Sequence, residues 1–326
     1  MNRRLNHAAS DGLNQAVLNN HQLPSPVDIL KGGPWEERGI TFLVKRDDQI
    51  HPEVSGNKWR KLIPNLEEAA RQGHHRIVTF GGAFSNHIAA TAAAGKMFGF
   101  ETVGLIRGER KLPLNPTLAK AVENGMLLFF LSREMFRQMH EPVFQTKIQA
   151  EYGPCYLLPM GGTNTLGISG CENAVQEIAQ QLPKLPDYLC ACCGTGGTFS
   201  GLVAGMQGRG KLLGFPALKG NFLQYDIQYL LHSYRNGHCS NWQLMQDYHF
   251  GGYAKYNDPL LAFIGQFKEQ YGLLLDPIYT GKMFYGIVDL IQKGFFAEGS
   301  TILAVHSGGL QGILGFNERF GQSLPK

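Results

Sequence analysis

Short apolar runs alternate with amphipathic segments over most of the 326-residue chain. The runs have the length of buried strands, and the segments between them repeat apolar residues at helical spacing. This alternation predicts the α/β class, with parallel sheets covered by helices on both faces. The predicted strands cover residues 40–45, 77–80, 102–106, 127–131, 188–193, 212–218 and 301–306. The predicted helices begin near 58 and 86 and otherwise cover 116–123, 133–150, 166–181, 198–206, 222–234, 259–271 and 282–292.

The chain is long for one domain, so the pattern favours two doubly wound parallel-sheet lobes over a single sheet. We expect residues 1–60 and 162–326 to form a large domain and residues 61–161 a small one. Residues 1 to about 25 carry few strongly apolar side chains and are expected to be a loosely attached lead-in. Ligands of such folds bind at the carboxyl ends of the strands, so the crevice between the lobes is the expected site.

Charge and composition narrow the class of ligand. The formal net charge is +4, and no run of basic residues with interleaved aromatic residues suggests a nucleic-acid surface. No apolar segment has the length of a signal peptide at the N-terminus or of a membrane span elsewhere. We therefore expect a cytoplasmic protein with a small-molecule substrate, and neither nucleic acid nor a membrane as partner.

Three of the six cysteines lie in the predicted strand over 188–193. A strand points Cys190 and Cys192 to one face and Cys193 to the other. Zinc is one interpretation of this cluster, but no C-x-x-C or H-x-x-H partner follows it. Buried thiols in a reducing compartment are the interpretation we favour, so we expect no metal site.

Lys58 stands where a loop containing Gly56 passes into a helix whose apolar positions begin at Trp59. An amine in a first helical turn is partly dehydrated, and Arg60 and Lys61 surround it with positive charge. Both influences lower the pKa of an ammonium group, and an unprotonated lysine forms an imine with an aldehyde. A solvated lysine is the alternative. The residues indicate pyridoxal phosphate (PLP) chemistry, provided that a phosphate cradle, a carboxylate site and a partner for the ring nitrogen lie elsewhere.

A glycine loop follows the strand over 188–193, and it consists of Gly194, Thr195, Gly196, Gly197 and Thr198. It offers consecutive N–H groups and two hydroxyls without side-chain bulk at a strand-to-helix turn, which favours phosphate binding. It is no Walker loop, because no lysine follows the last glycine, and the G-x-G-x-x-G dinucleotide pattern is incomplete. A simple tight turn is the alternative.

Further loops bring candidate polar groups. Ser85, followed by Asn86 and His87, stands at the start of a predicted helix. It suits an N-cap, and the free N–H groups of the same turn suit an anion such as a substrate carboxylate. Tyr279 lies in a loop that leads into a helix, and Ser307 follows the last strand, so either brings a hydroxyl toward a ring nitrogen or a reacting carbon.

With these loops in view, residues 42–312 resemble the fold type II PLP-dependent enzymes, which are built like the tryptophan synthase β-subunit. Within that group, the sequence is similar to the D-cysteine desulfhydrase / 1-aminocyclopropane-1-carboxylate (ACC) deaminase family. The matching segments are Lys45-Arg46-Asp47-Asp48, Ser55-Gly56-Asn57-Lys58 through Lys61-Leu62, Ser85-Asn86-His87, Met160-Gly161-Gly162-Thr163-Asn164 with Gly167 and Gly170, Gly194 to Thr198, Asp276-Pro277 through Lys282, and Ser307-Gly308-Gly309.

The resemblance implies a role for each candidate residue. Lys58 binds the cofactor covalently and then serves as the base at the substrate α-carbon, while the large domain holds PLP. The residues implied to bind the cofactor are Lys58, Lys61, Asn86, Gly194, Thr195, Gly196, Gly197, Thr198, Thr280 and Ser307. The residues implied to bind substrate are Ser85, Asn86 and His87, and those implied to be catalytic are Lys58, Ser85, Tyr253 and Tyr279.

The resemblance further implies a homodimer and a β-elimination that converts D-cysteine to pyruvate, sulfide and ammonia. ACC deaminases resemble this chain but typically carry glutamine in place of His87 and glutamate in place of Thr280. Such a glutamate pairs with a protonated ring nitrogen, which a neutral threonine cannot do, so these differences favour the desulfhydrase. An arginine often found near Ile88 is absent, and Lys255-Tyr256 replaces a more usual Gly-Val/Leu-Pro. The alternatives are an ACC deaminase, a PLP-binding protein without turnover and a β-replacement synthase.

Overall fold

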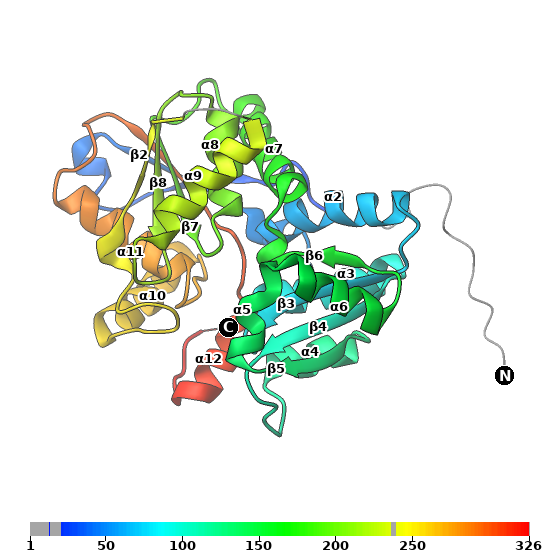
Figure 1. The fold of residues 1–326 in the computed structure, drawn as a ribbon. Coiled ribbons are helices and arrows are strands. Elements are labelled where there is room, and N and C mark those ends of the chain that lie inside the picture. Colours follow the sequence, from blue (N-terminus) through cyan, green and yellow to red (C-terminus); the bar gives the residue numbers. More distant parts are fainter. Residues whose placement is uncertain (1–12, 14–20, 236–238, 326) are drawn as a thin grey trace. The chain divides into compact units, whose positions relative to one another are not determined.

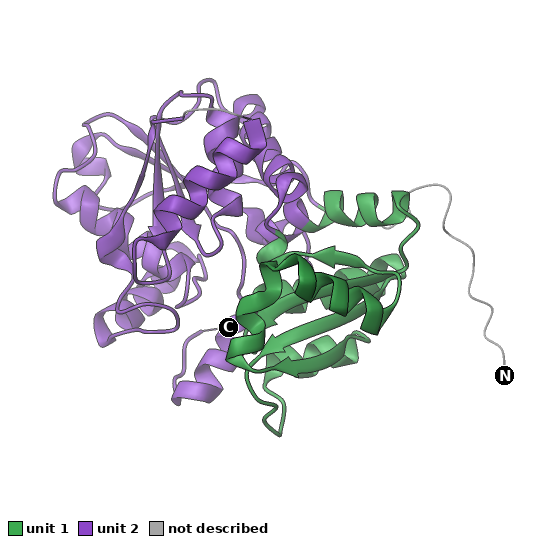
Figure 2. Ribbon diagram, in the orientation of Figure 1, with its two compact units in different colours: residues 1–21, 62–162 green, residues 22–61, 163–326 purple. Residues whose placement is uncertain are grey.

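A computed structural model describes residues 13, 21–235 and 239–325 of the chain (Figure 1). The chain divides into two compact units, which are coloured separately in Figure 2. Unit 1 comprises residues 1–21 and 62–162, and unit 2 comprises residues 22–61 and 163–326. Each unit contains one sheet built mainly from parallel strands, so the expectation of an α/β protein with two parallel-sheet lobes is confirmed.

The sheet of unit 2 has the strand order β1-β2-β10-β7-β8-β9. Its strands are β1 (Val27–Leu30), β2 (Thr41–Lys45), β7 (Tyr188–Cys193), β8 (Lys211–Pro216), β9 (Trp242–Leu244) and β10 (Thr301–Val305). All neighbours pair in parallel except β1, which runs antiparallel to β2 at one edge. The central strands β2, β10 and β7 are almost wholly buried, as expected for parallel strands covered on both faces.

Helices cover both faces of this sheet, because alternate residues of each strand supply two separate apolar clusters. On one face Cys190, Cys192 and Ile302 pack with α10 (Asp258–Tyr271), α11 (Thr280–Gln292) and α12 (Gly312–Phe320). On the other face Cys193 and Leu303 pack with α7 (Thr165–Gln181), α8 (Gly197–Met206) and α9 (Phe222–Arg235). The expectation that Cys193 faces away from the other two thiols is therefore confirmed.

The sheet of unit 1 has the order β5-β4-β3-β6, with all neighbours parallel. Its strands are β3 (Arg76–Gly82), β4 (Glu101–Arg107), β5 (Leu127–Leu131) and β6 (Tyr156–Leu158). The apolar residues of α3 (Asn86–Phe98) and α4 (Pro116–Glu123) pack on one face. Those of α5 (Arg133–Arg137) and α6 (Pro142–Tyr152) pack on the other. Helix α2 (Asn57–Arg71) begins in unit 2, and its residues from 62 onward belong to unit 1.

Some predicted elements differ from the structure. The single helix predicted over 133–150 is wrong, because the chain makes α5, a 3-10 turn at Gln138–His140 and then α6. Pro142 lacks an N–H donor and has a fixed φ, so it starts a new helix instead of continuing the first. The sequence analysis also missed β1, β6, β9 and α12, which are short or carry little alternation. Most of the predicted N-terminal lead-in lies outside the described residues.

All six cysteines are free thiols, and five of them are buried. Within residues 21–235 and 239–325, no cluster of three or more His, Cys, Asp or Glu side chains has the arrangement of a metal site. None of the helices in the described ranges combines the length and the apolar character that a membrane crossing requires.

Candidate active site

The turn that carries Lys58 packs closely against the loop after β10. Gly56 has φ +66°, and a side chain there would begin 1.9 Å from the carbonyl oxygen of Ser307. The backbone N–H of Asn57 donates to that same carbonyl at 3.2 Å. Glycine is required here by both the left-handed conformation and the close approach. The approach places the first turn of α2 beside Ser307.

Asn57 connects Lys58 with the glycine loop. The Nζ of Lys58 donates to Oδ1 of Asn57 at 2.8 Å, and Nδ2 of Asn57 donates to Oγ1 of Thr198 at 2.8 Å. Thr198 lies in the first turn of α8, whose N-terminus begins at Gly196 with φ +81°. The amine that should carry the chemistry is thereby fixed to the predicted phosphate cradle through one side-chain amide.

Lys61 reaches the same loop by a second route. Its Nζ donates to Oγ1 of Thr163 at 2.8 Å, and the hydroxyls of Thr163 and Thr195 lie 2.5 Å apart. A side chain at position 197 would begin 2.9 Å from Nζ of Lys61, so only glycine leaves room there. An ammonium group, two hydroxyls and the N-terminus of a ten-residue helix make a site suited to a phosphate dianion.

The two lysines have unusual protonation equilibria. Burial lowers the pKa of the Lys58 ammonium. Burial, followed by the neighbouring charge of Lys58, lowers the pKa of Lys61 to about 7. Burial, one of the two causes expected, therefore lowers the pKa of Lys58 as predicted. An amine of low pKa at residue 58 is suited to attack an aldehyde, and a second cation three residues later is suited to a phosphate.

Arg60 does not surround Lys58 with charge as the sequence analysis expected. Its guanidinium is 2% exposed and binds Asp47 and Glu177, with the shortest contact to each at 2.7 Å. Lys45 joins this buried network through Glu177 at 2.8 Å. The helical rotation from Lys58 to Arg60 sends the two side chains to different sides of α2. Arg60 thus fixes the first turn of α2 within unit 2 and leaves the basic character of the candidate site to the two lysines.

Tyr279 lies against the glycine loop. A side chain at Gly194 would begin 3.3 Å from its ring and 3.5 Å from its hydroxyl oxygen. The ring of Tyr253 stands edge-on to that of Tyr279, with the centroids 6.2 Å apart. Burial and then the neighbouring Tyr253 raise the pKa of the Tyr279 phenol well above its usual value. Tyr279 therefore stays a neutral hydrogen-bond donor at physiological pH.

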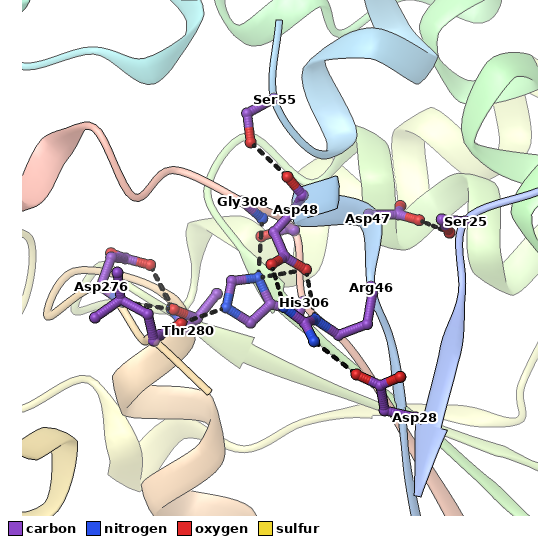
Figure 3. Close-up of polar contacts among 12 residues, drawn as sticks. Ser25, Asp28, Arg46, Asp47, Asp48, Ser55, Asp276, Thr280, His306 and Gly308 are labelled. Atoms are coloured by element: carbon purple, nitrogen blue, oxygen red, sulfur yellow. Dashed lines mark hydrogen bonds and ion pairs between the residues drawn. The ribbon is translucent and has the colours of Figure 1, made fainter. Parts of the chain in front are cut away.

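A buried carboxylate fixes the backbone of Tyr279. Asp276 accepts hydrogen bonds from the N–H groups of Ile278 and Tyr279 at 2.8 Å and of Thr280 at 2.9 Å. The hydroxyl of Thr280 donates to the same carboxylate at 2.7 Å and accepts from the N–H of Asp276 at 2.9 Å (Figure 3). The single proton of the Thr280 hydroxyl is thus donated inside its own turn.

Ser307 contacts the end of β7, where its Oγ lies 3.0 Å from Sγ of Cys192. The residue before it, His306, is fully buried, and its Nε2–H donates to the carbonyl of Leu274 at 2.7 Å. Nδ1 of His306 accepts from the N–H of Gly308 at 3.3 Å and lies 3.4 Å from the carboxylate of Asp48 (Figure 3). This network holds the loop that carries Ser307 to the segment just before the Lys58 turn.

The remaining candidates lie in unit 1, at the junction of β3 and α3. Ser85 is the N-cap of α3, as expected, and accepts from the N–H of Ile88 at 3.4 Å. Asn86 is the first residue of the helix. His87 is buried, with Nε2 2.8 Å from the hydroxyl of Thr79, which itself donates to a backbone carbonyl. Nε2 of His87 is therefore the protonated ring nitrogen.

The chemistry of these groups fits PLP. The Lys58 amine suits its aldehyde, and the Lys61 ammonium with the Thr163 and Thr195 hydroxyls suits its phosphate. A family model described as "Pyridoxal-phosphate dependent enzyme" matches residues 21–308. The chain belongs to this family of PLP-dependent enzymes. PLP is accordingly its cofactor.

Individual relatives extend over nearly the whole chain. A protein of Pyrococcus abyssi named putative 1-aminocyclopropane-1-carboxylate deaminase is 32% identical, over 87% of this chain and 92% of its own. A protein of Serratia proteamaculans named D-cysteine desulfhydrase is 30% identical, over 86% of this chain and 89% of its own. A solved structure described as an ACC deaminase homologue superposes with a TM-score of 0.80 at 28% identity, covering 93% of this chain and 97% of its own.

Three residues of this site were absent from the predicted set. Asn57 and Thr163 stand in the matched motifs, but nothing in their spacing shows that they connect the lysines with the glycine loop. Cys192 was expected to be an inert buried thiol, and its contact with Ser307 is visible only in the fold. Its position as the next-to-last residue of β7, just before the glycine loop, was the available signal.

Proposed function

We propose that this PLP-dependent enzyme is a β-eliminating lyase whose preferred substrate is D-cysteine. The products are then pyruvate, sulfide and ammonia, with one water molecule consumed. The observation that carries the choice of reaction is Thr280, a neutral residue whose hydroxyl proton is donated to Asp276. No carboxylate stands at that position to stabilise a protonated ring nitrogen, which is the feature expected of the ring-opening relatives.

We assign PLP to unit 2 on the basis of Lys58 and the glycine loop. Lys58 would supply the covalent link, and the phosphate would be held by Lys61, Thr163 and the loop residues Gly194, Thr195, Gly196, Gly197 and Thr198. Ser307 and Thr280 would hold the pyridine ring, with the hydroxyl of Ser307 as the partner of its nitrogen. When bound, the cofactor supplies an electron sink for the charge left at the substrate α-carbon.

The protein residues then handle protons and orientation. Lys58, with its low pKa, accepts the proton from the α-carbon. Tyr279 and Tyr253 would flank the leaving sulfur, where Tyr279, which keeps its phenol proton, would donate a hydrogen bond. Asn86 would contact the 3′-oxygen of the cofactor, and Ser85, Asn86 and His87 would bind the substrate. These unit 1 roles are supported by the resemblance and by the N-cap geometry of Ser85.

An ACC deaminase, a hydrolase that forms 2-oxobutanoate and ammonia, is the second candidate. It is favoured by the name of the Pyrococcus abyssi relative and by the related solved structure. We also propose a cytoplasmic homodimer, on the basis of the family resemblance. A PLP-binding protein without turnover is the candidate of another class.

The test measures products from four substrates with purified, PLP-loaded protein. Pyruvate, sulfide and 2-oxobutanoate are followed with D-cysteine, L-cysteine, D-serine and ACC. Lys58→Ala removes the proposed covalent link and base, and the matched control Lys31→Ala removes an exposed lysine of the same unit. We expect sulfide and pyruvate in equal amounts from D-cysteine, about 10²-fold or more below that rate in Lys58→Ala, and no change in Lys31→Ala.

Each of the other outcomes would favour a different function. Formation of 2-oxobutanoate from ACC without sulfide from D-cysteine would overturn the reading of Thr280. A yellow protein that turns over none of the four substrates would favour the candidate without turnover. Products that appear only when a second nucleophile is added would identify a β-replacement synthase.

A further inference from the structure

The loop that carries Tyr253 has an unusual backbone. It lies between the 3-10 turn Gln246–Tyr248 and α10, and φ is positive at Phe250 (53°), Gly251 (89°), Gly252 (117°) and Ala254 (56°). Residues other than glycine rarely adopt this region, and Phe250 and Ala254 both adopt it within five residues. Such a backbone persists only where surrounding contacts enforce it. The position of Tyr253 therefore depends on the contacts that hold this loop in its conformation.

Lys282 makes contacts that hold the loop in this conformation. Its side chain is almost completely buried, and Nζ donates to the carbonyl of His249 at 2.9 Å and to that of Gly252 at 2.8 Å. Hydrogen bonds within the loop add to this: the N–H of Gly251 donates to Nδ1 of His249, and the N–H of Gly252 donates to the His249 carbonyl. One ammonium group thus joins the two carbonyls that bracket the turn.

The location of Lys282 connects the two tyrosines. It stands in the first turn of α11, three residues after Tyr279. The turn before that helix is fixed by Asp276, which binds the backbone of Tyr279 directly. The same short segment therefore carries one buried charge that fixes the backbone of Tyr279 and another that fixes the loop of Tyr253.

Lys282 is also a costly residue for this position. Burial lowers the pKa of its ammonium to about 8, and the charge of Asp276 only partly opposes this shift. An apolar side chain of similar length would fill the same space without that cost, but it could not donate to the two carbonyls. The ammonium group is therefore what the two contacts with the loop require.

We propose that Lys282 is a positioning residue, which holds the loop from His249 to Ala254 by its two backbone carbonyls and so fixes Tyr253 against Tyr279. The hold on the loop is a property of the fold alone. Its consequence for turnover rests on the proposed function, through the role given to Tyr253.

The first test reads the loop without substrate. Hydrogen exchange followed by mass spectrometry compares the PLP-loaded wild type with Lys282→Met and with the control Lys293→Met, which replaces an exposed lysine at the C-cap of the same helix. In Lys282→Met we expect amides of residues 250–255 to exchange about tenfold faster or more, while those of β7 and β8 stay unchanged. Lys293→Met should match the wild type throughout. Unchanged exchange in the loop of Lys282→Met would overturn the proposal.

The second test asks whether Lys282 acts through Tyr253. Lys282→Met should lower kcat for D-cysteine about 10- to 100-fold with little effect on PLP absorbance, and should add less than about threefold in a Tyr253→Phe background. Full additivity of the two losses would contradict action through Tyr253. If the wild type turns over no substrate, the proposed function fails while the exchange result still decides the hold on the loop.

A third arm covers the case in which Lys282→Met does not fold. Lys282→Ala is produced and assayed with and without n-propylamine, which fits the space of the missing chain and restores the two donations. Restored protection of residues 250–255 by the amine, but not by propanol, is the expected result. Recovery of a folded Lys282→Ala protein with wild-type exchange in the absence of amine would overturn the proposal.

Discussion

Lys61 shows how single residues of this site give up stability for binding. Its ammonium is 2% exposed, lies near Lys58 and has a pKa of about 7, against an ordinary value of 10.5. The unfolded chain therefore binds more protons than the folded one between these two pH values. Stability from this group rises as pH increases from 7 to 10.5, and the full penalty applies below 7. A bound phosphate offsets that penalty by supplying the missing anion.

Lys61→Met should therefore stabilise the protein without PLP and weaken its binding of PLP. We expect a gain of about 1–4 kcal/mol in the free energy of unfolding at pH 6, because an apolar side chain replaces a buried cation. The gain should shrink as pH rises toward 10. Urea unfolding at several pH values measures the first effect, and titration of the PLP absorbance the second. A loss of stability at pH 6 together with unchanged PLP affinity would contradict this role.

At the scale of elements, two separate sets of contacts hold the first turn of α2 in place. One is the close packing of Gly56 against the loop of Ser307, and the other is the buried network of Arg60 with Asp47 and Glu177. The network joins α2 to the segment after β2 and to α7. Together they determine where Lys58 lies relative to the glycine loop.

Gly56→Ala tests the close packing of the Gly56 turn against the loop of Ser307. Gly73, which follows α2, also has a positive φ of 75°, but a side chain there would meet nothing within 4 Å. Gly73→Ala should cost only the conformational term of about 1 kcal/mol in unfolding free energy. Gly56→Ala should cost about 2–4 kcal/mol and reduce PLP affinity more than tenfold, because it also separates the two loops. Equal effects of the two substitutions would show that the close approach is unimportant.

Arg60→Met tests the ion-pair network of Arg60 with Asp47 and Glu177. It leaves the buried carboxylate of Asp47 and the partly buried carboxylate of Glu177 without their main partner, so we expect a loss of about 3–5 kcal/mol in the free energy of unfolding at pH 7. Arg71→Met, an exposed arginine of the same helix, should change stability by less than about 0.5 kcal/mol. Urea denaturation measures both.

The loss of unfolding free energy in Arg60→Met should also depend on pH. Burial raises the pKa of Glu177, but the hydrogen bonds and charges of Arg60 and Lys45 outweigh it, so the net pKa lies below the ordinary value of 4.5. The stabilisation by this pair is present above pH 4.5 and is lost as pH falls through the lowered folded value. A loss of unfolding free energy that stays constant down to pH 3 would contradict the stabilisation of the Glu177 carboxylate by Arg60.

Elements with strong periodicity could be predicted from the sequence, whereas contacts between distant segments could not. The strand Tyr188–Cys193 and the helix Pro116–Glu123 have the predicted bounds, because apolar runs and a Pro start are local signals. The burial of Arg60 among carboxylates is not local, since Glu177 lies 117 positions away. The candidate residues were found from motifs, while Asn57 and Lys282 acquire their roles only through such distant contacts.

At the scale of the whole molecule, the two units hold different parts of the predicted residue set. Lys58, Lys61, the glycine loop and Ser307 belong to unit 2, and Ser85, Asn86 and His87 belong to unit 1. PLP that binds the folded protein stabilises it by about 2.7 kcal/mol when its free concentration is 100 times Kd. How that stabilisation distributes over the chain depends on which residues contact the cofactor.

Hydrogen exchange with and without PLP should therefore separate the proposed roles. Contacts to Lys58, Lys61 and the phosphate predict slower exchange at residues 56–61 and 195–199 in unit 2. A contact from Asn86 to the cofactor additionally predicts slower exchange at residues 86–89 in unit 1, and Asn86→Ala should remove only this second effect. Protection confined to unit 2 in the wild type would overturn the cofactor role of Asn86, since exchange slows only where binding suppresses local opening. Protection at 86–89 that survives Asn86→Ala would instead assign the contact to the backbone N–H groups at the start of α3, the anion-binding geometry of a helix N-terminus.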